Sequence, residues 1–279
     1  MKLTLLAPAK LNLTLDILGR TPDNYHQLDS VMLAVDLCDT LTLARCGEGV
    51  RLSCDDPSLE VEDNLVLKAT RALFAHIGIN PGGLALTLEK RIPSQAGLGG
   101  GSANAAATLV GLNQLYAARL SESELSQLGL SVGADVPFCL QGGCARAQGK
   151  GEILTPLPRP AGVFVIAKPP QSMSTHRAFE LYDRAGVEHA PRTSEMIAAL
   201  RCKDLAGVGK AMSNAFEQVL DVPEARTIKQ IMLECGALGA ALTGSGSAVA
   251  GLFESEAIAA NCTQRLKNSA QFVQVVRPV

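Results

Sequence analysis

Aromatic residues are scarce in this chain, which has no tryptophan, three tyrosines and seven phenylalanines in 279 residues. An aromatic side chain in a polar loop therefore stands out from the average composition of a globular protein. Tyr25 is such a residue, and His26 follows it in the turn-rich segment 19–27. This loop offers a flat ring and an imidazole to a ligand.

An excess of charge of either sign is also absent. Lys and Arg number 25 against 27 for Asp and Glu, and no basic run is present. This balance gives no electrostatic footprint for a nucleic acid or a membrane surface, so the expected partner is a small molecule. No apolar segment approaches the ~18 residues of a membrane span, and the apolar run at the N-terminus is too short for a signal peptide. We expect a cytoplasmic protein.

Disulfide and metal-binding patterns are missing as well. Eight cysteines lie at positions 38, 46, 54, 139, 144, 202, 235 and 262, with no CxxC pair and no metal spacing with histidine. Several lie in apolar runs, as small hydrophobic residues do, so we expect reduced thiols.

Periodicity of the apolar residues favours an α+β protein. Odd-numbered positions are apolar from Leu3 to Ile17, which predicts a half-buried strand with Lys10 and Asn12 side by side on its other face. From this segment alone, an ordinary exposed face is the more common explanation for a strand that carries a lysine. Three prolines in residues 155–160 favour a boundary between two domains, 1–155 and 156–279.

Start and stop signals predict the remaining elements. Strands are expected at 31–37, 40–43, 50–54, 84–90, 136–140, 163–167, 248–253 and 272–276. Helices are expected at 65–77, 102–117, 122–130, 174–184, 193–200, 203–220, 223–235 and 255–268. Asn64 is the expected start of the first helix, and Ser121 with Glu124 forms a capping-box pattern at the third.

A glycine-rich segment, Gly97-Leu98-Gly99-Gly100-Gly101-Ser102, lies between a predicted strand and a predicted helix. Backbone N–H groups can approach a ligand closely there, and a helix start adds unpaired donors, so an anion such as a phosphate would be stabilised. The spacing is neither a Walker A motif nor a Rossmann fingerprint, and a plain tight turn stays open. A second glycine loop, residues 236–247, could close over the first.

Three features together meet the needs of a kinase that phosphorylates an alcohol. This reaction needs a phosphate cradle, a cation near the transferred group and often a carboxylate to take the hydroxyl proton. The candidates are the glycine loop, Lys10 and Asp135. For Asp135, which precedes Val136-Pro137, a simple turn or cap aspartate is as compatible with the local sequence.

Three blocks of the chain resemble the GHMP kinase superfamily. They are Pro8-Ala9-Lys10-Leu11-Asn12, then Ile92-Pro93 through Ser102-Ala103-Asn104, and Leu242-Thr243-Gly244-Ser245-Gly246. The resemblance implies an N-terminal domain similar to ribosomal protein S5 domain 2 and a C-terminal ferredoxin-like domain. It also implies ATP as the phosphate donor.

Three further blocks resemble the superfamily members that act on a cytidyl-sugar alcohol. They are Pro22-Asp23-Asn24-Tyr25-His26, Gly133-Ala134-Asp135-Val136-Pro137-Phe138 and Gly149-Lys150-Gly151-Glu152. For the substrate, the resemblance implies phosphorylation of a 2-hydroxyl, as a step of the non-mevalonate route to isoprenoid precursors.

Residue roles follow from the same resemblance. Asp135 matches the catalytic base, and Lys10 matches the lysine that lowers the pKa of the substrate hydroxyl. The implied substrate-binding residues are Asn12, Tyr25 and Phe179, with Tyr25 and Phe179 as rings on opposite sides of the cytosine, and His26, which hydrogen-bonds the base edge. The implied ATP-binding residues are Pro93, Gly97, Leu98, Gly99, Gly100, Gly101, Ser102, Asn104, Gly244, Ser245 and Gly246.

Mg²⁺ is expected with ATP, because it neutralises phosphate charge during transfer. Ser102 and Asp135 are nearby candidate ligands, but a metal held by phosphates and waters fits the sequence equally well. The sequence does not indicate an oligomeric state.

The chain departs from the family pattern at three points. Asn24 stands where glycine is common, Ser94-Gln95 replace small apolar residues, and Asn214 is not followed by the usual acidic residue. Two other functions stay open. A homoserine or mevalonate kinase would share the glycine loops without needing Tyr25 and His26. A sensor or scaffold would not need Lys10 and Asp135.

Overall fold

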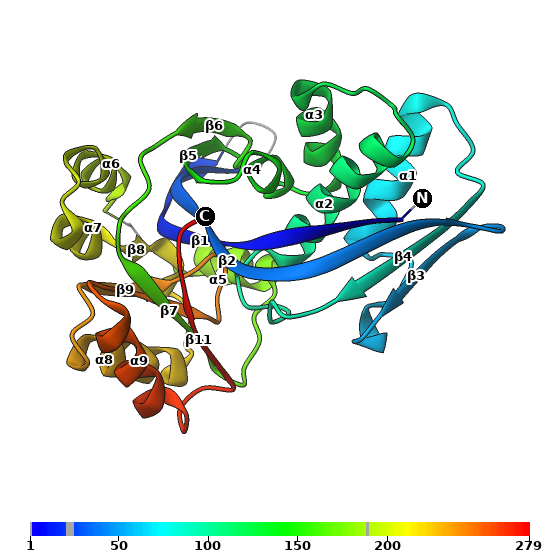
Figure 1. The fold of residues 1–279 in the computed structure, drawn as a ribbon. Coiled ribbons are helices and arrows are strands. Elements are labelled where there is room, and N and C mark those ends of the chain that lie inside the picture. The colour runs from blue at the N-terminus through cyan, green and yellow to red at the C-terminus, as the bar shows by residue number, and fades with distance from the viewer. Residues whose placement is uncertain (1, 21–24, 188–189) are drawn as a thin grey trace. The chain divides into compact units, whose positions relative to one another are not determined.

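The computed structural model describes residues 2–20, 25–187 and 190–279 (Figure 1). Its contacts divide the chain into two compact units that alternate along the sequence. Unit 1 consists of Met1–Ala9, Leu37–Ile92 and Gly99–Gln141, and unit 2 of Lys10–Asp36, Pro93–Leu98 and Gly142–Val279. The single domain boundary expected between residues 155 and 156 stays a prediction.

In unit 1, helices cover strands through an aliphatic core. Strand β4 (Gly83–Glu89) pairs parallel with β3 (Val50–Cys54) and antiparallel with residues 40–46 of β2 (His26–Cys46). The other elements are the first part of β1 (Lys2–Arg20), η1 (Pro57–Leu59), α1 (Leu65–Ile77), α2 (Gly100–Leu115), α3 (Glu122–Val132) and α4 (Val136–Gln141). Leucines of both layers, including Leu43, Leu73 and Leu109, are fully buried between them.

Unit 2 contains the rest of β1 and β2 and a second sheet. Residues 28–33 of β2 pair with β5 (Cys144–Gly149), which pairs with β6 (Ile153–Pro156), and β1 runs parallel to β8 (Ser213–Asn214). The second sheet is antiparallel in the order β11 (Phe272–Val276), β7 (Val163–Lys168), β10 (Val249–Phe253) and β9 (Gly239–Leu242).

Helices of unit 2 complete the α+β architecture. They are α5 (Thr175–Ala185), α6 (Thr193–Cys202), α7 (Leu205–Ala211), η2 (Ala215–Gln218), α8 (Pro223–Glu234) and α9 (Glu256–Leu266). The apolar sides of α8 and α9 pack on the second sheet, where Ile228, Met232 and Leu266 are fully buried (Figure 1). The α+β fold class is confirmed.

Capping signals located the helix ends well. Asn64 accepts a hydrogen bond from Val66 N over 2.9 Å at the start of α1, and Gly78 ends this helix with a left-handed φ of 66°. Both bonds of the predicted capping box are present at Ser121 and Glu124. These short-range bonds satisfy the unpaired groups of a helix end, so the local sequence specifies them.

Two predicted elements are wrong. The strand expected at 136–140 is helix α4, which tolerates Pro137 because this residue falls in the first turn, where a missing N–H costs nothing. The segment 203–220, expected to be a single helix, instead contains three elements: helix α7, the short strand β8 and the 3₁₀ helix η2. Here the side chain of Asn214 accepts from Phe216 N, which offers the backbone an alternative to the helix.

Other differences concern continuity. The strands expected at 31–37 and 40–43 are parts of one long strand, β2, and the sequence did not predict β5, β6, β8 or β9. The predictions concerning Pro22, Asp23 and Asn24 lie outside the described residues.

Candidate active site

The glycine loop before α2 has a run of left-handed backbone positions. Gln95, Gly97 and Gly99 have φ values of 51°, 76° and 68°. Gln95, one of the departures from the family pattern, therefore occupies a conformation that favours glycine. Gly99 is the N-cap of α2 and makes no side-chain capping bond. The first amides of α2 are therefore suited to an anion.

In unit 1, the turn that holds Asp135 lies against the start of α2. A Cβ placed on Gly133 would be 3.7 Å from Ser102 Oγ, and the Asp135 carbonyl accepts from Cys139 N over 3.1 Å at the start of α4. Asn104 is 3% exposed, and its Oδ1 atom has no hydrogen-bond partner within the described residues. A buried acceptor in this state fits a donor from a ligand.

In unit 2, the structure brings Lys10 and Asn12 together on the interior of β1. Both side chains are less than 5% exposed, so the alternative of an exposed polar face is excluded. Lys10 Nζ donates to Asn12 Oδ1 over 2.6 Å, and Asn12 Nδ2 donates to Ser30 Oγ over 2.8 Å. The backbone N–H of Lys10 also donates to Leu98 O over 3.0 Å, which ties β1 to the glycine loop.

Within unit 2, the second glycine loop contacts the start of the first, whereas its closure over the whole first loop from another domain stays a prediction. Thr243 Oγ1 donates to Gly97 O over 3.3 Å, and Ala248 N donates to Ala96 O over 3.2 Å. A Cβ on Gly97 would lie 1.9 Å from Thr243 O, and one on Gly244 would lie 3.1 Å from Lys10 Nζ. Glycine is therefore required at both positions for the loops and the lysine to approach this closely.

Sequence reasoning assigned no site role to two residues that shape the second loop. Asn214 Nδ2 donates to Leu242 O and Gly244 O over 3.0 and 2.8 Å from a fully enclosed position. Thr175 Oγ1 lies 3.1 Å from Ser245 Oγ, within hydrogen-bond distance. The sequence did contain a signal that could have pointed to Asn214, because this polar residue and Ser213 lie between the apolar pairs 211–212 and 215–216.

The predicted aromatic residues also lie in unit 2. Lys150 Nζ stands 3.5 Å from the centroid of the exposed Tyr25 ring, as a cation–π contact. The rings of His26 and Phe179 are stacked, with centroids 4.4 Å apart and an interplanar angle of 22°. The structure thus brings His26 and Phe179 together, whereas the placement of Tyr25 and Phe179 on opposite faces of a base stays a prediction.

Asp183 on α5 adds a charge to this aromatic group. His26 Nε2 lies 2.8 Å from Asp183 Oδ1, and Arg20 donates to the other carboxylate oxygen. Partial burial acts to raise the pKa of Asp183, but the hydrogen bonds from His26 and Arg20 outweigh it and hold this pKa below its usual range.

Lys10 and the second glycine loop belong to unit 2, and Ser102, Asn104 and Asp135 belong to unit 1. The functional pairing of Lys10 with Asp135 therefore stays a prediction.

The described residues contain no group of three or more His, Cys, Asp or Glu side chains that could hold a metal ion. The eight cysteines are free thiols in the structure. Within the parts of the chain that the structure describes, no helix is both long and apolar enough to cross a membrane.

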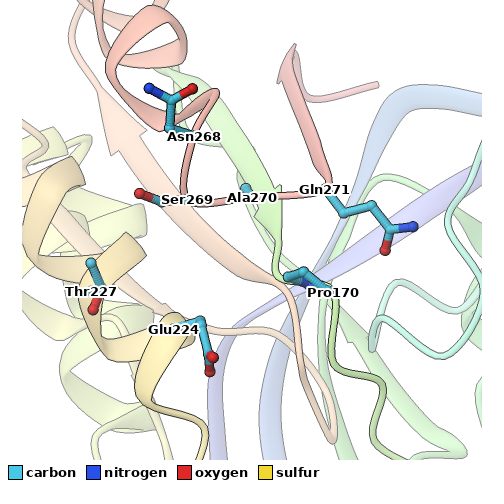
Figure 2. Close-up of a pocket in the computed structure, with 7 residues that line it drawn as sticks. All are labelled: Pro170, Glu224, Thr227, Asn268, Ser269, Ala270 and Gln271. Carbon is cyan, nitrogen blue, oxygen red and sulfur yellow. The ribbon is translucent and has the colours of Figure 1, made fainter.

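Figure 2 shows a separate cavity of about 580 Å³ in unit 2, beside α8 and the segment that follows α9. Its lining includes Glu224, Thr227 and Gln271, and none of the predicted site residues.

Comparison with known proteins gives the class. Residues 64–143 match the GHMP kinases N terminal domain, and residues 196–270 match the GHMP kinases C terminal domain. A homoserine kinase from Cytophaga hutchinsonii has a TM-score of 0.78 at 23% identity, over 99% of this chain and 94% of its own, which shows a shared fold.

Two relatives are similar at higher identity. The 4-diphosphocytidyl-2-C-methyl-D-erythritol kinase of Alkaliphilus metalliredigens is 42% identical over 88% of this chain and 86% of its own length. The enzyme of the same name from Symbiobacterium thermophilum is 40% identical over 96% and 97%. A crystal structure of 4-(cytidine 5'-diphospho)-2C-methyl-D-erythritol kinase has a TM-score of 0.83 at 31% identity, over 98% of this chain and 99% of that one.

The chain therefore belongs to the GHMP kinases, and within them to the family of the 4-diphosphocytidyl-2-C-methyl-D-erythritol kinases.

Proposed function

We propose that this protein transfers the γ-phosphate of ATP to the 2-hydroxyl of 4-diphosphocytidyl-2-C-methyl-D-erythritol, in the non-mevalonate route to isoprenoid precursors. The observation that carries the proposal is the meeting of Lys10, the first glycine loop and the second glycine loop in unit 2. A buried ammonium beside two glycine-rich backbone loops is an environment suited to a transferring phosphoryl group.

ATP fits the residues of both glycine loops. In unit 1, the uncapped start of α2 would offer backbone donors to its phosphates, and Asn104 Oδ1 would accept from a donor of the nucleotide. In unit 2, Gly97 and Gly244 are the proposed phosphate-binding glycines. Ser245 and Gly246 complete the second loop, and Pro93 precedes the first.

Mg²⁺ would neutralise phosphate charge when bound with ATP. Ser102 and Asp135 are the candidate protein ligands, and coordination by phosphates and waters is equally compatible with these residues.

In the proposed reaction Asp135 takes the proton of the substrate hydroxyl, and Lys10 stabilises the charge that develops on its oxygen. Asn12 holds the ammonium in place through the 2.6 Å bond. Tyr25 stacks on the cytosine, His26 bonds its edge and Phe179 supplies a further ring. Eight free thiols fit a cytoplasmic enzyme.

A coupled assay of ADP release tests the proposal. It would compare the cytidyl-methylerythritol with homoserine, mevalonate and phosphomevalonate at equal concentration. We expect turnover with the cytidyl substrate alone. Turnover with another alcohol instead would contradict the assignment, and no turnover with any of them would favour a sensor or scaffold.

Substitution of Tyr25 tests the cytidyl part of the assignment. Loss of a stacked base costs about 1–3 kcal/mol, so Tyr25→Ala should raise KM for the cytidyl substrate roughly 5- to 150-fold. KM for ATP is the internal control and should not change. An unchanged KM for the cytidyl substrate would show that Tyr25 does not bind its base.

A further inference from the structure

The contact between His26 and Asp183 carries a consequence for base selection. His26 is the first residue of β2, and Asp183 lies in α5. Their polar atoms are 2.8 Å apart, and stacking on Phe179 fixes the plane of the imidazole. The ring therefore has a defined orientation, with one nitrogen directed to the carboxylate.

The charge of Asp183 decides which nitrogen of His26 carries hydrogen. An ionised carboxylate is an acceptor without a proton to donate, so Nε2 must be the donor in this bond. The depressed pKa of Asp183, which results from its bonds to His26 and Arg20 despite partial burial, keeps this carboxyl ionised at neutral pH. In a neutral imidazole the other nitrogen, Nδ1, is then an acceptor.

Arg20 has a second effect on this pair. Its guanidinium shares the carboxylate with His26, so the negative charge already has a permanent cationic partner. Both groups therefore donate to Asp183, and hydrogen on Nε2 of His26 satisfies this bond.

We propose that Asp183 is a positioning residue that fixes His26 in the Nε2–H tautomer, so that Nδ1 accepts from the exocyclic amine of cytosine and rejects uracil. Uracil has a carbonyl oxygen where cytosine has this amine, so two acceptors would face each other. Sites built to bond an N–H reject analogues that lack it, because a buried polar group is then left unpaired. This inference rests on the proposed function for the identity of the base.

Nitrogen NMR of the protein labelled with ¹⁵N-histidine tests the tautomer without any substrate. The chain has four histidines, so the signals of His26 can be assigned as those lost in His26→Gln. In the wild type we expect Nε2 to be protonated and Nδ1 to be unprotonated at neutral pH. A proton on Nδ1, alone or together with Nε2, would overturn the proposal.

Asp183→Asn is the variant that separates positioning from folding. Its amide can present either oxygen or nitrogen to His26, so the tautomer is no longer imposed, while size and exposure hardly change. Asp183→Glu keeps the carboxylate and should restore most of the effect. Glu180→Gln is the matched control, because Glu180 lies on the same helix but bonds Arg177 and Arg184.

The kinetic readout is the ratio of kcat/KM for the cytidyl substrate and its uridyl analogue. In Asp183→Asn we expect this ratio to fall about tenfold, the size of one hydrogen bond, mainly through KM, while kcat stays near the wild-type value. Asp183→Glu and Glu180→Gln should keep the ratio. An unchanged ratio in Asp183→Asn, with a wild-type tautomer, would reject the proposal.

The two readouts keep this inference distinct from the proposed function. If the wild type does not phosphorylate the cytidyl substrate, the proposed function fails. The NMR spectrum still decides whether Asp183 sets the tautomer of His26.

Discussion

Lys10 and Asn12 form a hydrogen bond of 2.6 Å between side chains that the fold almost fully encloses. Asn12 in turn donates to Ser30 Oγ, and Ser30 donates to the carbonyl of Thr14 over 2.5 Å. The ammonium of Lys10 is therefore held by a buried polar network, where the low dielectric strengthens each bond.

Removal of Asn12 should therefore misplace the ammonium. Hydrogen bonds to charged groups contribute about 1.5–3 kcal/mol, so Asn12→Ala should lower kcat by roughly 10- to 150-fold. The measurement is steady-state ADP release at saturating ATP. Thr4→Val is the control on the same strand, because Thr4 is exposed, lies in unit 1 and forms a hydrogen bond with Thr42. A wild-type kcat in Asn12→Ala would contradict this role.

Gly97 is expected to tolerate no side chain. In Gly97→Ala the new methyl group would stand 1.9 Å from Thr243 O at a φ of 76°, so the two glycine loops must separate. We expect KM for ATP to rise at least about tenfold, since misplaced donors lose the strength of one or more phosphate bonds, together with a lower Tm.

Gly82→Ala is the matched control for that variant. Gly82 also has a left-handed φ, of 63°, but nothing lies within 4 Å of its Cβ position. It should show the backbone cost of about 1–2 kcal/mol in the free energy of unfolding without a change in KM for ATP. An equal change in KM for ATP in Gly97→Ala and Gly82→Ala would show that the contact of Gly97 with Thr243 does not affect ATP binding.

Much of the fold was predictable because its signals are local. Asn64 and Gly78 bound α1 through bonds to neighbouring residues, and alternation over 3–17 located β1. The segment 136–140 was not predictable in this way, because a short apolar run fits a strand or a helix equally. Its helical state depends on packing of Val136 and Phe138, which are fully buried.

The residues of the candidate site likewise fall into those that the sequence predicted and those that it did not. Lys10, Asn12 and the glycine loops were found because their types and spacing carry a chemical pattern. Asn214 and Asp183 were not, since their partners Gly244 and His26 lie 30 and 157 residues away along the chain. Contacts of this kind depend on the tertiary fold, and no periodicity or motif encodes them.

Asp39, which lies in β2, should stabilise the segment just ahead of the first glycine loop. Its fully buried carboxylate accepts from Arg91 N and Ile92 N over 2.7 and 2.8 Å and forms an ion pair with Lys90, whose side chain is 12% exposed. Asp39→Ala leaves a largely buried ammonium and two amides without this acceptor. We expect the free energy of unfolding to fall by about 3–5 kcal/mol in urea denaturation.

Asp221→Ala is the control for Asp39. Asp221 also forms an ion pair, in this case with Arg226, but the side chain of Asp221 is 84% exposed. Exposed ion pairs contribute about 0–1 kcal/mol, so this substitution should change stability little. A loss below about 1 kcal/mol in Asp39→Ala as well would show that the buried bonds contribute no more than a surface pair.

Asp135 should be needed for turnover and not for ATP binding. Asp135→Ala removes the group proposed to take the proton, so kcat should fall below detection while ATP still binds with a similar Kd, as measured by calorimetry.

Asp135→Asn separates two roles, because the amide can orient a hydroxyl but cannot take its proton. If proton transfer matters, Asp135→Asn should be as inactive as Asp135→Ala. If Asp135 mainly orients the hydroxyl in a loose phosphoryl transfer, Asp135→Asn should keep a measurable fraction of kcat with an unchanged pH–rate profile. Normal turnover in Asp135→Ala would exclude both roles.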